Sequence, residues 1–248
     1  MRGSCLCGAV VFEADEPLRQ VIACHCTQCR KTSGHYWAAT GVPMDRFRLI
    51  REDGLRWYQS SPTARRGFCG GCGASLFWEP EGEGRISIAA GALDGETGLT
   101  IVSHWHLDYA GDYYTPDAIP GAADILHGGC LCGANQFTLP GPMGEVWACH
   151  CTQCRKTSGH FAASFDADET DLHWQRKDLA EHRSPAGGTR GFCPTCGSSL
   201  YFRKGDEFSV EAGAIANPTS GALARHIFTA EKGDYYTLTD GLPQHSGA

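Results

Sequence analysis

The chain has 248 residues, 42% of them hydrophobic and 20% charged, which is the composition of an ordinary folded protein and excludes a disordered or fibrous class. Its net charge of -7 at pH 7 argues against a general nucleic-acid binder, because such proteins usually carry a basic surface. The sequence contains no apolar run of about 18 residues, so no membrane span is predicted. The first residues lead into a cysteine motif without an apolar signal segment, and the expected location is cytoplasmic.

Short segments rich in β-forming residues follow one another along the chain, separated by Gly, Pro, Asp and Ser. Strands are predicted over Cys5–Phe12, Phe47–Arg51, Leu55–Tyr58, Ser75–Trp78 and Ile86–Ala89, and a second opening strand over Cys130–Leu139. No segment shows a long apolar stripe with the 3.6-residue period of a helix. The predicted class is all-β, with short strands and turn-rich connections.

All 14 cysteines belong to two copies of one pattern. The first copy has Cys5-x-Cys7, Cys24-x-Cys26-x-x-Cys29 and Cys69-x-x-Cys72; the second has Cys130-x-Cys132, Cys149-x-Cys151-x-x-Cys154 and Cys193-x-x-Cys196. The offset is 125 residues at Cys130 and 124 residues at Cys193. The chain is therefore a tandem duplication. We expect two domains, residues 1–122 and 123–248, joined through a stretch with the composition of a connection, Pro116–Gly129.

The cysteine spacing favours metal binding over disulfides, because no export signal is present and the pairs are spaced like metal ligands. Residues i and i+2 of a strand point to the same face, so Cys5 and Cys7 can present two sulfurs together. With the Cys69-x-x-Cys72 turn they would form a closed four-thiolate zinc site. Cys130, Cys132, Cys193 and Cys196 would do the same in the second copy.

Each copy then has three cysteines left in one tight loop: Cys24, Cys26 and Cys29, and Cys149, Cys151 and Cys154. Three ligands and an open position are typical of catalytic zinc. The spacing does not decide between this open site and one that His25 or His35 closes, and it leaves other pairings of the cysteines open. The loop Ala23–His35 recurs unchanged as Ala148–His160 while its flanks have drifted, which favours a functional loop.

Three motifs carry a family resemblance: Gly3-x-Cys-x-Cys-Gly8, Cys24-His-Cys-x-x-Cys-Arg-Lys-x-x-Gly34 and Gly67-Phe-Cys-x-x-Cys-Gly73, each present again in the second copy. The chain resembles the glutathione-dependent formaldehyde-activating enzyme (GFA) family, which includes centromere protein V. The resemblance implies tandem β-tent domains. It also implies a structural zinc in each quartet and an exchangeable zinc in each trio, two per domain and four per chain.

The resemblance further implies a carbon–sulfur lyase-type reaction that joins glutathione and formaldehyde to give S-hydroxymethylglutathione. Zinc would ionise a small thiol such as glutathione for addition to a small aldehyde. His35 and His160, six residues beyond the trios, are the candidate catalytic donors to the developing alkoxide. The alternative for both histidines is a packing role.

Basic residues follow each trio directly. Arg30 and Lys31, with Arg155 and Lys156, are the candidate substrate-binding residues, since they could meet the carboxylates of a glutathione-like ligand. Solvated charges, or charges that support the thiolates, are the alternative.

A second functional hypothesis is a non-catalytic, zinc-stabilised module that recognises a thiol ligand, a protein or a nucleic acid through aromatic residues. The candidate aromatics are Tyr36, Trp37, Trp57, Trp105 and Trp174. Redox sensing by the cysteine pairs, and iron in place of zinc, are further alternatives. The tyrosines of the repeated segments Gly111–Thr115 and Gly233–Thr237 are expected in core or interface packing.

Overall fold

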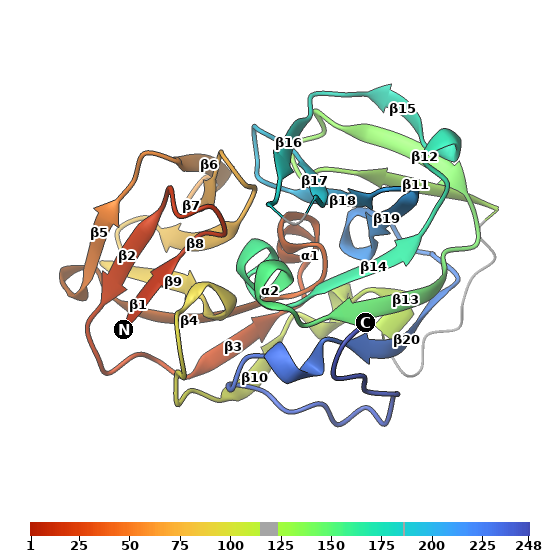
Figure 1. The fold of residues 1–248 in the computed structure, drawn as a ribbon. Coiled ribbons are helices and arrows are strands. Elements are labelled where there is room, and N and C mark those ends of the chain that lie inside the picture. Colours follow the sequence, from red (N-terminus) through yellow and green to blue (C-terminus); the bar gives the residue numbers. More distant parts are fainter. Residues whose placement is uncertain (115–123, 186) are drawn as a thin grey trace.

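The computed structural model describes residues 1–114, 124–185 and 187–248, which form two halves of similar architecture (Figure 1). The predicted domain boundary between residues 122 and 123 lies outside the described residues. Each half contains one three-stranded and one seven-stranded sheet. The prediction of an all-β protein with two similar copies is confirmed.

The first half builds its smaller sheet in the order β1-β2-β5, from β1 (Arg2–Ser4), β2 (Val11–Ala14) and β5 (Phe47–Arg51). Its larger sheet has the order β10-β3-β4-β9-β8-β7-β6. These strands are β10 (Ile101–Trp105), β3 (Val21–Cys24), β4 (Trp37–Pro43), β9 (Arg85–Ala89), β8 (Ser75–Pro80), β7 (Ala64–Cys69) and β6 (Leu55–Ser61). Strands β10 and β3 are parallel, and the other neighbours are antiparallel.

The second half repeats this order. Its smaller sheet is β11-β12-β15, from β11 (Ile125–Gly129), β12 (Gln136–Pro140) and β15 (His173–Arg176). Its larger sheet is β16-β17-β18-β19-β14-β13-β20. These strands are β16 (Ala180–Arg183), β17 (Thr189–Phe192), β18 (Ser199–Lys204), β19 (Glu207–Glu211), β14 (Ala162–Asp166), β13 (Gly144–Cys149) and β20 (Gly221–Ile227).

Two short α-helices were not predicted, α1 (Thr27–Ser33) and α2 (Thr152–Ser158). Seven residues are too few to show a periodic apolar stripe. The Cys26 side chain caps α1 by accepting from Cys29 N–H at 3.5 Å, and Gly34 ends it with φ of 86°. Short 3-10 helices complete the elements: η1 (Met44–Arg46), η2 (Ala90–Ala92), η3 (Leu107–Tyr109), η4 (Asp112–Tyr114), η5 (Glu169–Asp171), η6 (Ala212–Ala214) and η7 (Thr229–Glu231).

The predicted opening strands begin later than expected. Residues Cys5 to Val10 form a turn, and only from Val11 does the chain run as a strand. Cys5 N–H donates to Val10 O at 3.0 Å, and Val10 N–H donates to the Cys5 sulfur at 3.2 Å. The turn holds the sulfurs of Cys5 and Cys7 within 4.8 Å of those of the distant Cys69 and Cys72. In the second half, β12 likewise begins only at Gln136.

Each half has its own buried core. Phe12, Leu76, Phe77, Ile86 and Ile88 are fully buried in the first. Leu126, Phe137, Val146, Leu200 and Val210 are fully buried in the second. In both cores the smaller sheet contributes a phenylalanine that packs on residues of the larger sheet.

The two halves meet through the short helices, which lie at the centre of the molecule (Figure 1). Helix α1 packs on η6 and helix α2 on η2. Gly213 N–H donates to Gly34 O at 2.8 Å, and Gly91 N–H donates to Gly159 O at 2.9 Å. A Cβ atom on Gly91 would lie 2.4 Å from the carbonyl oxygen of Arg155, so this contact requires glycine.

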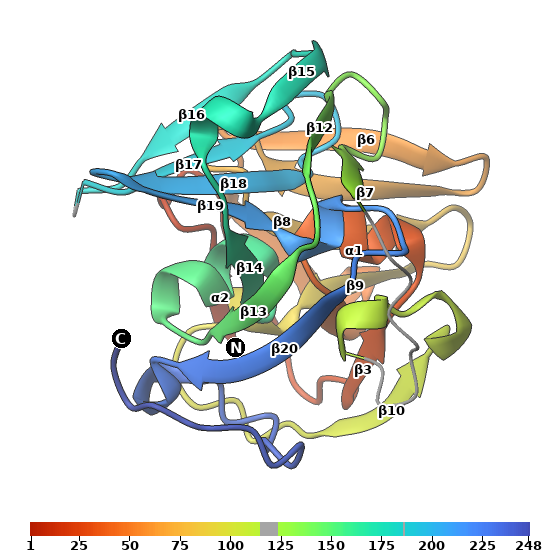
Figure 2. The same ribbon diagram turned by 90° about the vertical axis from the view of Figure 1, so that its right-hand side faces the viewer.

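The segment that ends each half docks on the other half. The Asp112 carboxylate accepts from Thr219 N–H at 2.7 Å and from its hydroxyl at 2.8 Å. The Asp234 carboxylate accepts from Thr97 N–H at 2.6 Å in the same way. The C-terminal tail runs along β20 and β10 (Figure 2), and Ile101 N–H donates to Tyr235 O at 2.9 Å. The halves are interlocked.

Candidate metal centres and the adjoining cavity

The structure brings the predicted quartets together. In Cys5, Cys7, Cys69 and Cys72, and in Cys130, Cys132, Cys193 and Cys196, all sulfurs of a quartet lie within 4.8 Å of one another. Cys7 Sγ is 3.6 Å from the sulfurs of both Cys5 and Cys69, too far for a disulfide. A zinc tetrahedron with Zn–S bonds of about 2.3 Å has edges of about 3.8 Å, so the quartet spacing suits that metal.

Each trio forms where a strand passes into a helix. Cys24 ends β3, Cys26 caps α1 and Cys29 lies in its first turn; Cys149, Cys151 and Cys154 repeat this at β13 and α2. The three sulfurs of each trio lie within 4.8 Å of one another, and among the described residues no fourth Cys, His, Asp or Glu joins the group. Hydrogen bonds from Cys24 and Cys29 lower the pKa of Cys26 to about 2, which favours a thiolate there.

The two histidines that could have closed the first trio hydrogen-bond elsewhere. His25 Nδ1 is 3.1 Å from the Tyr114 hydroxyl, and its Nε2 is 2.9 Å from His104 Nδ1. His35 Nδ1 is 2.8 Å from the Tyr113 hydroxyl. Of the two arrangements that the spacing left open, the structure contains the trio of sulfurs without a histidine.

An arginine that the sequence analysis did not single out reaches each trio. Arg66, only 7% exposed, donates from Nη2 to the sulfur of Cys29 at 3.5 Å and to Gln28 Oε1 at 3.4 Å. Arg190 in the second half lies 3.9 Å from the sulfur of Cys154. A guanidinium beside clustered thiolates reduces their mutual repulsion. The signal was present in the sequence, since Arg-Gly-Phe-Cys occurs in both copies.

A cavity of about 470 Å³ adjoins the first trio. All three of its cysteines, three arginines and three tryptophans are among the residues that line it: Arg19, Arg66, Arg85, Trp37, Trp78 and Trp105. The walls come from β3, β4, β7, β8, β9 and β10, so residues far apart in sequence shape one space. The cavity combines apolar walls with guanidinium groups at the sulfurs and at the rim, a lining that suits a small anionic ligand.

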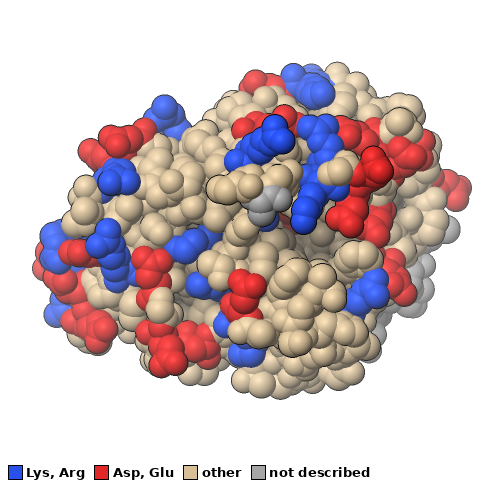
Figure 3. Space-filling view, viewed as in Figure 1, with Lys and Arg blue, Asp and Glu red and all other residues tan. Residues whose placement is uncertain are grey.

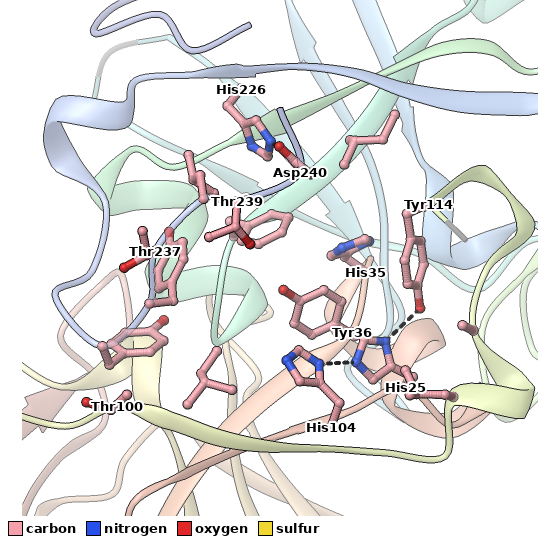
Figure 4. Close-up of a pocket in the computed structure, with 18 of the residues that line it drawn as sticks. His25, His35, Tyr36, Thr100, His104, Tyr114, His226, Thr237, Thr239 and Asp240 are labelled. Atoms are coloured by element: carbon pink, nitrogen blue, oxygen red, sulfur yellow. Dashed lines mark hydrogen bonds and ion pairs between the residues drawn. The ribbon is translucent and has the colours of Figure 1, made fainter. Parts of the chain in front are cut away.

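The predicted catalytic histidines lie elsewhere. His35 and His160 are 1% and 0% exposed, and His160 binds the hydroxyls of Tyr235 at 3.0 Å and Tyr36 at 3.1 Å. His35 lines a second cavity of about 680 Å³, together with His25, His104 and His226 (Figure 4). Burial lowers the pKa of His35 and His160 well below the ordinary value, so both rings are neutral. Their catalytic role stays a prediction.

The predicted substrate-binding cations reach across to the opposite half. Lys31 Nζ donates to Gly129 O at 2.9 Å, and Lys156 Nζ donates to Ser4 Oγ at 2.9 Å and pairs with Asp94 at 2.7 Å. Arg155 donates to the carbonyls of Gly91 and Leu93, and Arg30 is buried. Lys31 thus bonds to the residue just before Cys130, and Lys156 bonds to the residue just before Cys5. Cys130 and Cys5 are the first cysteines of the opposite half's quartet. Their substrate-binding role stays a prediction.

The predicted tyrosine packing is confirmed. Tyr113 is 3% exposed and belongs to the core cluster of the second half, and Tyr235 and Tyr236 belong to that of the first. Tyr36, Tyr113 and Tyr235 all bond to the buried histidines, so the aromatic content of the repeated segments serves the interface.

Comparison with known proteins places this geometry in a family. The profile described as "Glutathione-dependent formaldehyde-activating enzyme" matches residues 1–108 and 125–231. The chain belongs to this GFA family. Both matched segments contain one quartet and one trio, so the duplication carries two GFA copies with cysteine clusters that could each hold a metal ion.

Two further comparisons were made. Among solved structures, a crystal structure of a Rhodobacter sphaeroides protein is 25% identical with a TM-score of 0.35, covering 42% of this chain and 99% of that one. A comparison with curated proteins finds no match.

The surface adds two observations. On the face drawn in Figure 3, acidic and basic side chains are interspersed. Among the described residues, no helix is long and apolar enough to cross a bilayer.

Proposed function

We propose that the protein is a zinc-dependent carbon–sulfur lyase-type enzyme that adds a glutathione-like thiol to a small aldehyde, as in S-hydroxymethylglutathione formation. The observation that carries the proposal is the first trio. It offers three sulfurs, no fourth protein donor among the described residues, and an adjoining cavity of about 470 Å³. Two domains, 1–122 and 123–248, and four zincs per chain are part of the same proposal.

The chain supports such a reaction in four ways. A zinc ion in the trio would supply a position at which a substrate thiol ionises. Arg66 holds positive charge against the sulfur of Cys29 in a buried setting, so three thiolates can stay ionised together. Trp37 is buried, and with Trp78 and Trp105 it limits the water that reaches the reacting atoms. Rim arginines would hold substrate carboxylates and so orient the thiol.

The addition balances without a redox partner. The substrate sulfur forms a bond to the aldehyde carbon, and the carbonyl π electrons move to oxygen. The oxygen then gains one proton, which replaces the proton that the thiol has lost. The product is a hydroxyalkyl thioether.

The test compares the zinc-loaded chain with Cys26→Ser and Cys151→Ser. Serine is also a good helix N-cap, so these changes remove a ligand while preserving the start of each helix. We expect the protein to accelerate exchange between glutathione, formaldehyde and their adduct, followed by NMR exchange spectroscopy. We expect Cys26→Ser to abolish acceleration by the first trio and to reduce bound zinc by about one per chain.

An intact four-zinc chain that neither binds any small thiol nor accelerates the exchange would overturn the proposal and leave the zinc-stabilised binding module. Unfolding of the first half by Cys26→Ser, seen as loss of its quartet zinc as well, would likewise show that the trio is structural.

A further inference from the structure

The two trios have nearly identical sulfur arrangements but differ in the charges around them. In the first half, Arg66 is committed to Cys29 and Arg85 pairs with the exposed Glu83 at 2.6 Å, whereas Arg19 has no acidic partner among the described residues. Arg19 donates to the carbonyl oxygens of Gln20 at 3.0 Å and Ala39 at 3.1 Å, and these bonds leave its positive charge in place. Burial and the nearby Arg85 lower the pKa of Arg19, as expected for cations held close together.

Strand register identifies the equivalent positions in the second half. Pro43 pairs with Arg85 and Ala39 with Ala89 in the first half, and Ser164 pairs with Glu211 in the second. Counting back along the matching strands β9 and β19, Glu207 stands where the first half has Arg85. By the same register Asp166 replaces Gly41, and Gly144, five residues before Cys149, replaces Arg19.

Arg225 of the second half has partners of its own. Arg225 lies over the Trp147 ring at 4.2 Å and 3.9 Å from Glu145. Trp147 itself occupies the position of Ile22, which lines the first cavity. Burial raises the pKa of Asp166, the nearby Arg225 lowers it, and Glu207 raises it by carboxylate repulsion, so Arg225 offsets part of the negative charge at this position. From the first half to the second, Arg85 is thus replaced by Glu207, Arg19 by Gly144 and Gly41 by Asp166.

We infer that the two trios accept thiols of opposite charge. The first takes a thiol that carries carboxylates, and the second takes a thiol that is neutral or carries an ammonium group. This inference rests on the proposed function, because it assumes that the trios bind thiols. It adds that the two GFA copies have diverged in substrate class and that Arg19, Arg85, Asp166 and Glu207 set the difference.

The expected selectivity follows from ordinary charge–charge energies near a protein surface. One partly exposed ion pair changes affinity by up to about fivefold, and two pairs acting together, with repulsion at the other site, give a difference of tenfold or more. The neutral thiol 2-mercaptoethanol is the reference, because charges at the rim act on it least.

The experiment measures thiol binding to the zinc-loaded full chain by calorimetry at low salt. The Cys151→Ser variant has only the first trio intact, and the Cys26→Ser variant has only the second trio intact. The amount of zinc bound to each variant shows whether its quartets remain loaded. The probes are glutathione, 2-mercaptoethanol and cysteamine. We expect glutathione to bind about tenfold more tightly to Cys151→Ser than to Cys26→Ser, and cysteamine to show the reverse order.

Charge reversal then tests the residues. In Cys151→Ser, adding Arg85→Glu should lower the ratio of glutathione to 2-mercaptoethanol affinity about tenfold, and Arg85→Lys should restore most of it. Arg46→Glu, an exposed arginine of the same half outside the cavity lining, is the matched control. In Cys26→Ser, Glu207→Arg should raise the same ratio.

The outcomes separate the inference from the function beneath it. Equal affinity of glutathione for both trios, or an unchanged ratio in Arg85→Glu, would overturn the charge inference and leave the thiol chemistry standing. Failure of all three thiols to bind either trio would overturn the proposed function.

Discussion

Glu211 is a buried carboxyl at the interface between the halves, and it makes stability depend on pH. The residue is 8% exposed, and a Cβ atom on Gly34 of the other half would lie 2.5 Å from its Oε2. Burial raises its pKa from an ordinary value of about 4.5 to about 8, although Arg190 and a hydrogen bond from Ser199 oppose the rise. The folded chain therefore keeps a proton on Glu211 that the unfolded chain releases.

The sign and size of the effect follow from proton linkage. Between the two pKa values the folded state binds more protons than the unfolded state, so the free energy of unfolding falls as pH rises. The stabilisation is complete below the pKa that Glu211 has in the unfolded chain. It is lost progressively as pH rises above that pKa, and the loss ends above the pKa of Glu211 in the folded chain. A rise from about 4.5 to about 8 corresponds in full to roughly 4 to 5 kcal/mol, of which roughly 3 to 4 kcal/mol is lost between about pH 5 and pH 8.

Glu211→Gln keeps the shape of the protonated side chain and removes its titration. We expect the stability of the wild type relative to this variant to fall by roughly 3 kcal/mol over that interval. The measurement is urea denaturation at a series of pH values with equal free zinc, so that the pH dependence of metal binding cancels in the difference. Asp206→Asn, at an exposed position just before the same strand, should follow the wild type. Parallel curves for wild type and Glu211→Gln would refute the reasoning.

Three further predictions concern the interface and the metals. Gly91→Ala and Gly213→Ala would place a Cβ atom 2.4 or 2.5 Å from a carbonyl oxygen of the other half, and each should lower the free energy of unfolding in urea by about 2 kcal/mol or more. Gly247→Ala, which meets nothing within 4 Å, is their control. Lys156→Met removes charged hydrogen bonds to Ser4 and Asp94 and should cost about 1 to 2 kcal/mol, whereas Lys177→Met at an exposed position should change little. Removal of zinc by a chelator should abolish the cooperative thermal transition, because quartet binding is part of the folding free energy; an unchanged melt would contradict structural zinc.

The sequence was sufficient to predict the sets of cysteines that meet. The ligands of one metal ion must lie close together whatever path the chain takes. Because the pattern occurs twice, the same grouping of cysteines must work in both copies. Strands such as Phe47–Arg51 were equally predictable, because short runs of β-branched and aromatic residues between turn-forming residues are typical of strands. The turn at Cys5–Val10 was not, because sulfur geometry and hydrogen bonds to Cys5 override local β propensity there.

Proximity in sequence does not place Arg30 and Lys31 at the sulfurs of the trio, and their substrate-binding role stays a prediction. If the trio occupied a loop, its following cations would lie near it. Helix α1 instead turns each successive side chain by about 100°, so Lys31 points away from Cys29 to reach the other half. The cation that does contact Cys29, Arg66, comes from β7 and arrives through sheet pairing with β6 and β8. Only tertiary structure could supply that contact.

The interlocked halves also explain why one segment is unchanged between the copies while its flanks have drifted. Ala23–His35 and Ala148–His160 carry the trio, and they carry the contacts that hold the halves together, including Gly34 with Gly213 and Gly159 with Gly91. A substitution there would damage a metal site and the interface at once. Arg19, in the loop before β3, and Arg85, at the start of β9, lie outside the segment and line the first cavity. Those positions were free to change charge without cost to the fold, so divergence between the copies is expected at the rim of the sites and not at the sulfurs.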